Sequence, residues 1–427
     1  MSSDKEHEEK EAAADLDRRA FFRAFSRDAL NTAATVVGAA TAVRRGTTAA
    51  ASELLGISLS PEASADRLAT ALGLAGGGYR SPYRVGDGVV HVLDQRRLPA
   101  EAVDIECRTG GDVVATMRSL AARGGPLLGQ LAAYAMALAA ERNVASKPFV
   151  RNATLRGTGS ALIAARPDVG ALTAAVERCL AAWQSVGEMG DGADIAVAVR
   201  AVADAIASEA TLGLGRLCQT GAVLLAQPEG RPLEIVTIDE TGPLSGGLVG
   251  TALGVVQAVA AEGRPVHVWI LETRPARTGA RLAAPELRAS DVPCTVIADA
   301  AIGWLLSERT VDVALVGAER VAANGDVANA AGTYPLAVLA ERHGVPLHVC
   351  APLSAVDAGI ADGSGLAIAW RPAADVLVVA GEPSPPADTD ALVPLDDVTP
   401  AGLVADYVTD QGVLRPPFAA ALIGSAG

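Results

Sequence analysis

Lysine is almost absent from this chain of 427 residues, which contains only Lys5, Lys10 and Lys147. An anion-binding site beyond Lys147 must therefore use arginine, backbone N–H groups or helix N-termini. The formal net charge is −14. Because nucleic-acid backbones are bound by clustered Lys and Arg, this balance argues against nucleic acid as a ligand. We expect a small-molecule ligand instead.

Cysteine is also scarce. The five cysteines are odd in number, widely spaced and form no CxxC pair: Cys107, Cys179, Cys218, Cys294 and Cys350. This usage disfavours a disulfide framework and a zinc site, and it predicts a reducing, cytoplasmic location. No run of about 18 or more uncharged apolar residues occurs, so we expect no transmembrane helix.

Several motifs of common enzyme classes are missing. The sequence contains no GxxxxGK[ST], HExxH or GxSxG motif, which leaves P-loop NTPases, zincins and α/β-hydrolases without support. The GxGxxG fingerprint of NAD-binding folds is missing after the first strand. Aromatic residues make up only 3% of the chain, so the core must be built from Ala, Val and Leu.

Residues 1–78 form an N-terminal extension that ends in a glycine linker, Gly76–Gly78. The run from Arg18-Arg19 to Phe22, followed by an Ala-rich stretch, has some features of a twin-arginine export signal. Arg27 and Asp28 interrupt that stretch, and no clean cleavage site follows it. This favours a partly disordered or helical extension over an export signal.

The period of apolar residues predicts two domains after this extension. Residues 79–225 read as a mainly helical domain with one strand near its start. Its expected strand and helices are His91–Asp94, Gly110–Arg123, Leu127–Ala140, Ala161–Trp183 and Ile195–Leu214.

Residues 226–427 alternate short β-branched runs with helical patterns, which predicts a doubly wound, Rossmann-like, mainly parallel sheet. The expected strands are Leu233–Ile238, Val266–Leu271, Thr295–Ala298, Val313–Val316, Leu347–Ala351 and Val376–Val379. The tail from Val398 to Pro417 is expected to form a last helix and an extended arm.

Ligands of such sheets bind beyond the carboxyl ends of the strands. The run Val313–Val316 ends in Gly317-Ala318 and is followed directly by Glu319 and Arg320. A polar turn, Asn324-Gly-Asp, comes next. This stretch is therefore our first candidate for a functional site.

A collinear set of short motifs along residues 80–420 resembles the methylthioribose-1-phosphate isomerase family. That family shares a superfamily with the ribose-1,5-bisphosphate isomerases and the regulatory subunits of translation initiation factor 2B. The motifs are Arg123-Gly-Gly-Pro, Arg166-Pro, Cys218-Gln-Thr-Gly-Ala, Gly250-Thr-Ala-Leu-Gly, Glu272-Thr-Arg-Pro, Gly279-Ala-Arg-Leu, Gly317-Ala-Glu-Arg, Ala323-Asn-Gly-Asp-Val-Ala-Asn, Gly332-Thr-Tyr and Asp397-Val-Thr-Pro.

The resemblance implies an aldose–ketose isomerase that acts on a sugar 1-phosphate and forms a homodimer through the sheet domain. It implies no metal or organic cofactor. The family uses a cysteine and an aspartate as its two titratable groups, and these map onto Cys218 and Glu319. The glycines around Cys218 resemble a strand-to-helix turn, where a thiol is shifted toward thiolate. Without that context, Cys218 reads as a buried packing residue.

Glu319 keeps the carboxyl group of the family's aspartate but adds a methylene, which displaces the acid by more than about an ångström. Alternatively, Glu319 has a purely structural role and forms a salt bridge with a neighbouring arginine. For phosphate the resemblance implies the arginines at Arg123 and Arg166, with backbone N–H groups at turns such as Gly124. Alternatively, each arginine is a solvated surface charge that binds no phosphate.

Further positions of the expected pocket depart from the family. Its phosphate-binding glutamine is Thr278 here, and its Asn-Lys pair is Asn329-Ala330. The residue after the cysteine is Gln219 instead of Asn, and Leu271 replaces an Asp. Asp326 is expected either to bind a hydroxyl group or to fix a loop.

Three functional hypotheses follow from the resemblance. The first is an isomerase that converts a 5-substituted ribose 1-phosphate, methylthioribose-1-phosphate or a close analogue, into the ribulose 1-phosphate. A second isomerase hypothesis names ribose 1,5-bisphosphate or 5-deoxyribose 1-phosphate as substrate. The third is a non-catalytic, regulatory protein that binds a sugar phosphate or nucleotide. The retained cysteine favours an enzyme.

Overall fold

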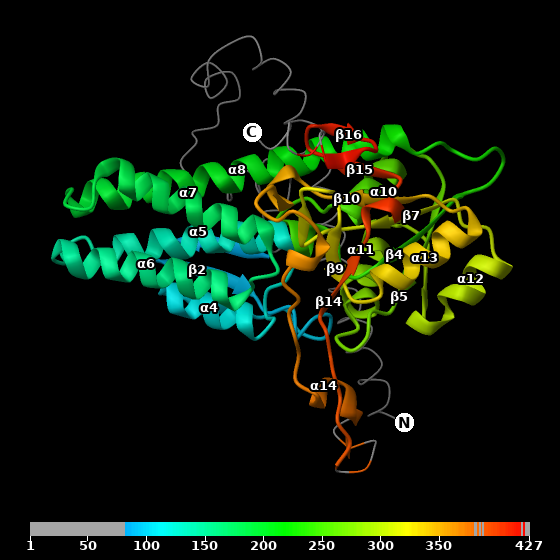
Figure 1. The fold of residues 1–427 in the computed structure, drawn as a ribbon, viewed down its shortest axis with the longest axis horizontal. Helices are drawn as coiled ribbons and strands as arrows, with labels where there is room; N and C mark the ends of the chain where they lie inside the picture. The colour runs from blue at the N-terminus through cyan, green and yellow to red at the C-terminus, as the bar shows by residue number, and fades with distance from the viewer. Residues whose placement is uncertain (1–81, 380–381, 384–385, 387, 420–421, 423–427) are drawn as a thin grey trace, which may run out of the picture.

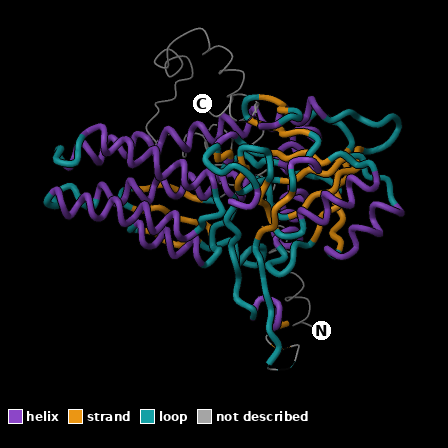
Figure 2. Tube along the Cα trace, viewed as in Figure 1, coloured by secondary structure: helices purple, strands orange, loops and turns teal. Residues whose placement is uncertain are grey.

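The computed structural model describes residues 82–379, 382–383, 386, 388–419 and 422. A helical half, α4 to α8, lies on one side of the molecule and a sheet half on the other, and the long helix α8 runs along both (Figures 1 and 2). The expectations for residues 1–78, including the export signal, lie outside the described residues.

The helical half combines five helices with a small antiparallel sheet of order β1-β2-β3. Its elements are β1 (Tyr83–Gly86), β2 (Val89–Leu93), β3 (Asp104–Cys107), α4 (Gly110–Arg118), α5 (Gly125–Glu141), α6 (Pro148–Ala165), α7 (Gly170–Val186) and α8 (Gly192–Leu224). Helix α5 is buried almost all round because its sequence is nearly free of polar side chains. It is therefore the centre of this half.

Two predicted helices end earlier than expected, and both endings matter for the site. The expected helix Ala161–Trp183 is two helices, because Pro167 forces Arg166 out of helical geometry (φ −144°, ψ 75°). The expected helix Gly110–Arg123 stops at Arg118. Arg123 and Arg166 consequently lie on loops between helices.

The main sheet has seven strands in the order β16-β15-β10-β7-β4-β5-β6. All neighbours pair in parallel except the edge strand β16. The strands are β4 (Leu233–Ile238), β5 (Val266–Leu271), β6 (Cys294–Ile297), β7 (Val313–Val316), β10 (Leu347–Cys350), β15 (Asp406–Thr409) and β16 (Gly412–Leu414). Chain order reverses between β4 and β7, which is the topological switch point of a doubly wound sheet. The predicted fold class is confirmed.

Helices cover both faces of this sheet (Figure 1). They are α9 (Pro243–Gly246), α10 (Ala252–Ala261), α11 (Ala284–Ala289), α12 (Ile302–Glu308) and α13 (Thr333–His343), with short turns η1 (Gly279–Ala283), η2 (Asp299–Ala301), η3 (Leu353–Ala355), η4 (Gly363–Gly365) and η5 (Ala401–Leu403). Alternate strand residues enter two cores: Ile235 packs with α8 and α10, while Val236 packs with α12 and α13. Of the described helices, none has the length and apolar character required to cross a membrane.

A second, four-stranded sheet of order β11-β8-β9-β14 stands beside the main one and carries the residues after Glu319. Its strands are β8 (Arg320–Ala322), β9 (Val327–Ala330), β11 (Val356–Asp357) and β14 (Asp396–Thr399). Between β11 and β14 an arm projects from the body (Figure 1) and carries α14 (Ala374–Leu377), β12 (Val378–Val379) and β13 (Glu382–Pro383).

Two expectations for the C-terminal part were wrong. The run Val376–Val379 is not a strand of the main sheet, because it lies on the projecting arm, where α14 begins two residues after Pro372. The tail from Val398 to Pro417 supplies β15 and β16, the last two strands of the main sheet. A four-residue strand such as Asp406–Thr409 is too short to show a clear period in the sequence.

Candidate functional site

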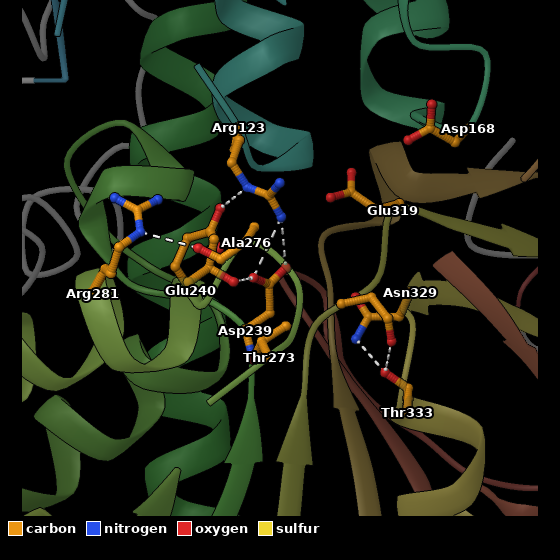
Figure 3. A network of polar contacts seen from close by, with 12 residues as sticks. Arg123, Asp168, Asp239, Glu240, Thr273, Ala276, Arg281, Glu319, Asn329 and Thr333 are labelled. Atoms are coloured by element: carbon orange, nitrogen blue, oxygen red, sulfur yellow. Dashed lines mark hydrogen bonds and ion pairs between the residues drawn. The ribbon is translucent and has the colours of Figure 1, made fainter. Parts of the chain in front are cut away.

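A cluster of buried charged side chains lies where the main sheet reverses its strand order (Figure 3). Asp239 and Glu240 directly follow β4, and Glu319 comes three residues after the end of β7. Strands β4 and β7 are hydrogen-bonded neighbours, with Thr237 opposite Leu315. The loops beyond their ends therefore line one crevice.

Arg123 reaches into this crevice from the loop between α4 and α5 (Figure 3). Its Nε donates a hydrogen bond to Glu240 Oε1 at 2.8 Å. Its Nη2 lies 3.4 Å from Asp239 Oδ2, a longer contact. Since Arg123 is only 7% exposed, the alternative of a solvated surface charge is wrong. The arginine is instead a buried cation shared by two carboxyl groups.

Asp239 is held in an unusual backbone conformation. Its φ of +66° lies in the left-handed region, which residues other than glycine rarely adopt. The Asp239 amide donates to Thr273 Oγ1 at 2.9 Å, and Thr273 also has a positive φ, of 62°. The Thr278 hydroxyl donates to Asp239 Oδ1. Strained residues cost free energy and cluster at functional sites, so Asp239 is a strong candidate.

Arg166 forms the second half of the cluster together with Asp168 and Glu319. Its Nη2 donates to Asp168 Oδ2 at 2.5 Å, and its Nε contacts both oxygens of that carboxylate. The same Nη2 lies 3.9 Å from Glu319 Oε1, at the limit of an ion pair. Arg166 is 4% exposed, so it too is no surface charge. The salt bridge expected for Glu319 exists but is loose, because Arg166 is bound mainly to Asp168.

Several buried atoms of the cluster have no hydrogen-bond partner within the described residues. They include Nη1 of Arg123, Nη1 of Arg166 and Oε2 of Glu319. Buried polar groups without partners are rare and call for an explanation. Two guanidinium donors and one carboxyl oxygen in a single crevice suit a ligand that carries an anionic group and hydroxyl groups.

The carboxyl groups of the crevice differ in their protonation. Burial raises the pKa of Glu319 to about 7, because the nearby Arg166 charge only partly offsets desolvation. Burial also raises the pKa of Glu240 well above its ordinary value. For Asp239, burial acts in the same sense, but the Arg123 charge and hydrogen bonds from Glu240 and Thr278 outweigh it and lower the pKa. Of the two neighbours, Asp239 therefore loses its proton more readily than Glu240.

A further buried acid faces the Glu319 side of the crevice. Asp396 on β14 is buried, and burial together with the charges of Asp168 and Glu319 raises its pKa well above its ordinary value. Within the described part of the chain, no group of three or more His, Cys, Asp or Glu side chains is arranged to hold a metal ion.

Cys218 is not at a strand-to-helix turn, so that expectation was wrong. It lies inside helix α8, six residues before its end, and belongs to the apolar core between α8, α10 and the sheet. Its thiol donates to the Gly250 carbonyl at 3.4 Å. Burial, and then the neighbouring Cys350, raise the pKa of the thiol. The expected shift toward thiolate is therefore reversed, and the packing alternative describes Cys218.

The pattern that pointed to Cys218 occurs a second time in the chain. Cys218-Gln-Thr-Gly and Asp239-Glu-Thr-Gly both precede Gly250-Thr-Ala-Leu-Gly and both end in Thr-Gly. Only the second copy lies at a strand end. Gln219, expected as a supporting residue, is exposed on α8 beside the buried thiol and is not part of the crevice.

The residues expected to bind phosphate differ in their hydrogen-bonding partners. Thr278 is fully buried, and its hydroxyl proton is used by Asp239. Because phosphate oxygens are acceptors, that hydroxyl is not available to donate to them. Asn329 donates to Thr333 Oγ1 at 3.0 Å (Figure 3). The Ala330 carbonyl accepts from the same hydroxyl at 2.7 Å. Ala330 offers no side-chain donor.

Asp326 fixes loops. Its Oδ1 accepts from the Ala401 amide at 2.8 Å, and its Oδ2 accepts from the Gly363 amide at 2.8 Å and from Asn324 at 2.9 Å. These contacts correspond to the loop-fixing alternative. They hold the Asn324–Asp326 turn against two other segments.

Gly124 and Gly125 allow the helical half to approach the crevice closely. A Cβ on Gly124, whose φ is +95°, would lie 2.2 Å from Ser245 Cβ. A Cβ on Gly125 would lie 3.2 Å from Glu319 Oε2, so helix α5 begins directly against this carboxyl group. Glycine is required by space at position 124, whereas a Cβ at position 125 would press on the Glu319 carboxyl group.

We predict that Gly125→Ala displaces the Glu319 carboxyl group by a few tenths of an ångström. Activity at this site should then fall about tenfold or more, since acid–base groups must be within hydrogen-bond reach. The matched control is Gly157→Ala on α6, where a Cβ meets nothing within 4 Å. It should raise helix stability by about 0.5–1 kcal/mol and leave activity unchanged. Equal activity of the two variants would refute the contact.

Glu286 supports the loop after Asp239 from below. Its Oε1 accepts from the Leu244 amide at 2.9 Å, and a Cβ on Gly242 would lie 2.0 Å from Oε2. Burial raises the pKa of Glu286 to about 8, although the Leu244 hydrogen bond acts against this. Glu286 is therefore neutral at pH 7 and acts as a packed hydrogen-bonding group.

The raised pKa of Glu286 gives a stability prediction with a definite sign. Its contribution is fully present below the unfolded value of 4.5 and is lost as pH rises to about 8. Glu286→Gln should match the unchanged protein at pH 5 and exceed its free energy of unfolding by about 2–5 kcal/mol above pH 8. Urea unfolding at the two pH values measures this, and an equal difference at both would contradict it.

The sequence prediction missed Asp168, Asp239, Glu240 and Asp396. The rule that found Glu319 applies equally to Asp239 and Glu240, since both follow the predicted strand Leu233–Ile238 directly. For Asp168, the adjacent Arg166-Pro pair was a usable signal. For Asp396, the adjacent Asp397-Val-Thr-Pro motif was a comparable signal, although β14 itself is too short to be recognised.

The chain is similar to known proteins over most of its length. A model described as the initiation factor 2 subunit family matches residues 121–416. Methylthioribose-1-phosphate isomerase from Pelotomaculum thermopropionicum is 39% identical over 333 residues, which are 78% of this chain and 90% of that protein. The protein of the same name from Thermus thermophilus is 37% identical over 348 residues, or 81% of this chain and 98% of that protein.

Two solved structures share the fold over most of the chain. The crystal structure of 5-methylthioribose 1-phosphate isomerase from Pyrococcus horikoshii matches with a TM-score of 0.69 and 30% identity, covering 81% of this chain and 95% of that one. The delta subunit of translation initiation factor eIF-2B from A. fulgidus matches with a TM-score of 0.65 and 28% identity, covering 80% and 97%.

Proposed function

The chain belongs to the initiation factor 2 subunit family, and from that premise we propose that it is an aldose–ketose isomerase. Its substrate is a 5-substituted ribose 1-phosphate, and methylthioribose-1-phosphate is the first candidate. The relatives that carry this enzyme's name are 37–40% identical over about four fifths of the chain, which supports the proposal.

The chemistry of the substrate defines what the site must do. Phosphate on the anomeric oxygen prevents spontaneous ring opening, so a group with an available proton must protonate the ring oxygen. A hydrogen must then move from C2 to C1. Two titratable groups with different protonation states suffice for this.

The single observation that carries the proposal is Glu319 in its buried setting. A carboxyl group with a pKa of about 7 holds a proton on roughly half of the molecules at neutral pH. It can therefore act first as an acid and later as a base. We assign Glu319 to the ring oxygen and to the C2 hydroxyl group.

The two arginines are proposed to hold the phosphate. Nη1 of Arg123 and Nη1 of Arg166 are buried donors without partners among the described residues. No lysine is available in the sheet domain, and guanidinium groups bind phosphate strongly. Asn329 is proposed as an additional polar contact at the turn before α13.

The direct test is turnover. Purified protein is incubated with methylthioribose-1-phosphate, ribose 1,5-bisphosphate or 5-deoxyribose 1-phosphate, and ¹³C NMR follows the appearance of a ketose carbonyl carbon. We expect conversion of at least one substrate. Tight binding of these sugars without any conversion would favour the regulatory, ligand-binding alternative.

We further propose three features that the described residues support indirectly. The chain divides near residue 225, at the end of α8, into two domains, since one apolar core is built from residues up to Ile206 and the others from Leu214 onward. It forms a homodimer through the sheet domain, where Trp304, Tyr334 and Val338 are exposed on α12 and α13. It resides in the cytoplasm, since all five cysteines are free thiols. Light scattering of the purified protein tests the dimer.

A further inference from the structure

We propose that the proton-transfer pair of this chain consists of two carboxyl groups, Asp239 and Glu319, and that no thiol takes part. This inference rests on the proposed isomerase function. It concerns which side chains carry the proposed reaction.

The positions of the two carboxyl groups follow from the sheet. Asp239 is the first residue after β4, and Glu319 lies just beyond the neighbouring parallel strand β7. A Cβ on Gly317, between β7 and Glu319, would meet Thr241 Cγ2 at 3.1 Å, so the two loops are in contact. A sugar ring in this crevice has one carboxyl group on each side.

Asp239 is positioned as a reacting group would be. Thr273 Oγ1 accepts from its amide at 2.9 Å, and the Thr278 hydroxyl donates to its Oδ1. The contacts of Arg123 Nη2 to its two oxygens are long, at 3.4 and 3.5 Å. Its backbone also stays in the left-handed region. A residue that served only to neutralise Arg123 would need neither a strained backbone nor the hydrogen bond from the Thr278 hydroxyl.

The two carboxyl groups have opposite protonation preferences, which is what acid and base roles require. Asp239 has a lowered pKa and is ionised, while that of Glu319 is raised to about 7. The charged groups that face Asp239 are Arg123 from the helical half, Glu240 beside it and Glu319 opposite. None of them is altered in the variants below.

The proposed step balances without a cofactor. Glu319 gives its proton to the ring oxygen as the C1–O4 bond breaks, and Asp239 takes the C2 proton. The C2–H electron pair becomes the C1=C2 double bond. Asp239 then returns the proton to C1, while the C2 hydroxyl gives its proton to Glu319 and becomes the ketone. Both carboxyl groups end as they began.

Cys218 is the internal control for this proposal. It is 1% exposed in the core beneath the loop and donates to a backbone carbonyl. Cys218→Ala should therefore leave kcat within about threefold of the unchanged protein, whereas Asp239→Asn should lower kcat by about 10²–10⁴-fold. Calorimetry should show that Asp239→Asn still binds the sugar phosphate. Iodoacetamide should leave Cys218 of the native protein unmodified, as judged by mass spectrometry.

A second variant guards against misfolding of Asp239→Asn. Thr278→Val removes a hydrogen bond to the ionised form of Asp239, so it raises the pKa of that carboxyl group. The acidic limb of the kcat/KM profile should then move to higher pH. A fall in kcat for Cys218→Ala, or full activity of Asp239→Asn, overturns the carboxyl pair. Absence of turnover by the unchanged protein overturns the proposed function itself.

Discussion

Replacing Glu319 by glutamine is expected to lower kcat by about 10²–10⁴-fold, because an amide N–H is far too weak an acid to protonate the ring oxygen. The substitution preserves shape, and the carboxyl group is already close to half neutral at pH 7. Folding should therefore be affected little. Substrate affinity should stay similar, since the proposed phosphate ligands are Arg123 and Arg166.

The pH profile separates this role from a structural one. Activity that needs protonated Glu319 should fall as pH rises through about 7, and this inflection should be missing from the residual activity of Glu319→Gln. Glu319→Asp is the matched control because it keeps an acid but withdraws it by one methylene. It should retain more activity than the glutamine variant. Unchanged kcat in Glu319→Gln would remove Glu319 from the mechanism.

Arg123→Met is expected to cause the largest loss of stability, about 3–5 kcal/mol, because it leaves Asp239 and Glu240 buried without their cation. The control is Arg84→Met, which breaks a contact of 2.6 Å to Asp104. The Arg84 side chain is 53% exposed, so that variant should lose at most about 1 kcal/mol. Urea unfolding measures both. Equal losses would show that the Arg123 cluster is not a buried, coupled unit.

The pH dependence of this loss has a definite sign. In the unchanged protein the pKa of Asp239 is lowered, so its contribution is present above the unfolded value of 3.8 and is lost as pH falls through the folded value. Without Arg123, burial raises that pKa instead. The difference between Arg123→Met and the unchanged protein should therefore be smallest in acid and grow as pH rises.

The sequence predicted the main sheet well because buried parallel strands appear in a sequence as short β-branched runs. Such runs can be recognised without knowledge of the tertiary structure. Leu233–Ile238, Val266–Leu271 and Val313–Val316 appear in the structure with those bounds. The relatives confirm the resemblance drawn from the short motifs. The sequence did not predict the elements that depend on long-range contacts, such as strand β15 near the C-terminus.

Only some residues of the candidate site were predicted from the sequence. Glu319, Arg123 and Arg166 meet at one crevice, as expected, although the two arginines lie on loops that the predicted helix ends did not show. Cys218 was chosen from a short pattern, and a pattern of four residues cannot distinguish the middle of a helix from a strand end. Asp239 satisfied the stronger criterion, since it directly follows a predicted strand.

The burial of this cluster could not be predicted from composition. An acidic chain has many carboxyl groups, and only packing decides which of them lose water. Glu319 acquires its raised pKa because α5 begins at Gly125 directly against it. That contact joins residues nearly 200 positions apart in the sequence.

A crystal structure of Glu319→Gln with methylthioribose-1-phosphate bound tests the central claim most directly, since the slowed variant retains its substrate. We expect the sugar ring between Asp239 and Gln at position 319, with the phosphate against Nη1 of Arg123 and of Arg166. A sugar bound outside this crevice, or one whose C2 faces the Cys218 thiol, would contradict the account.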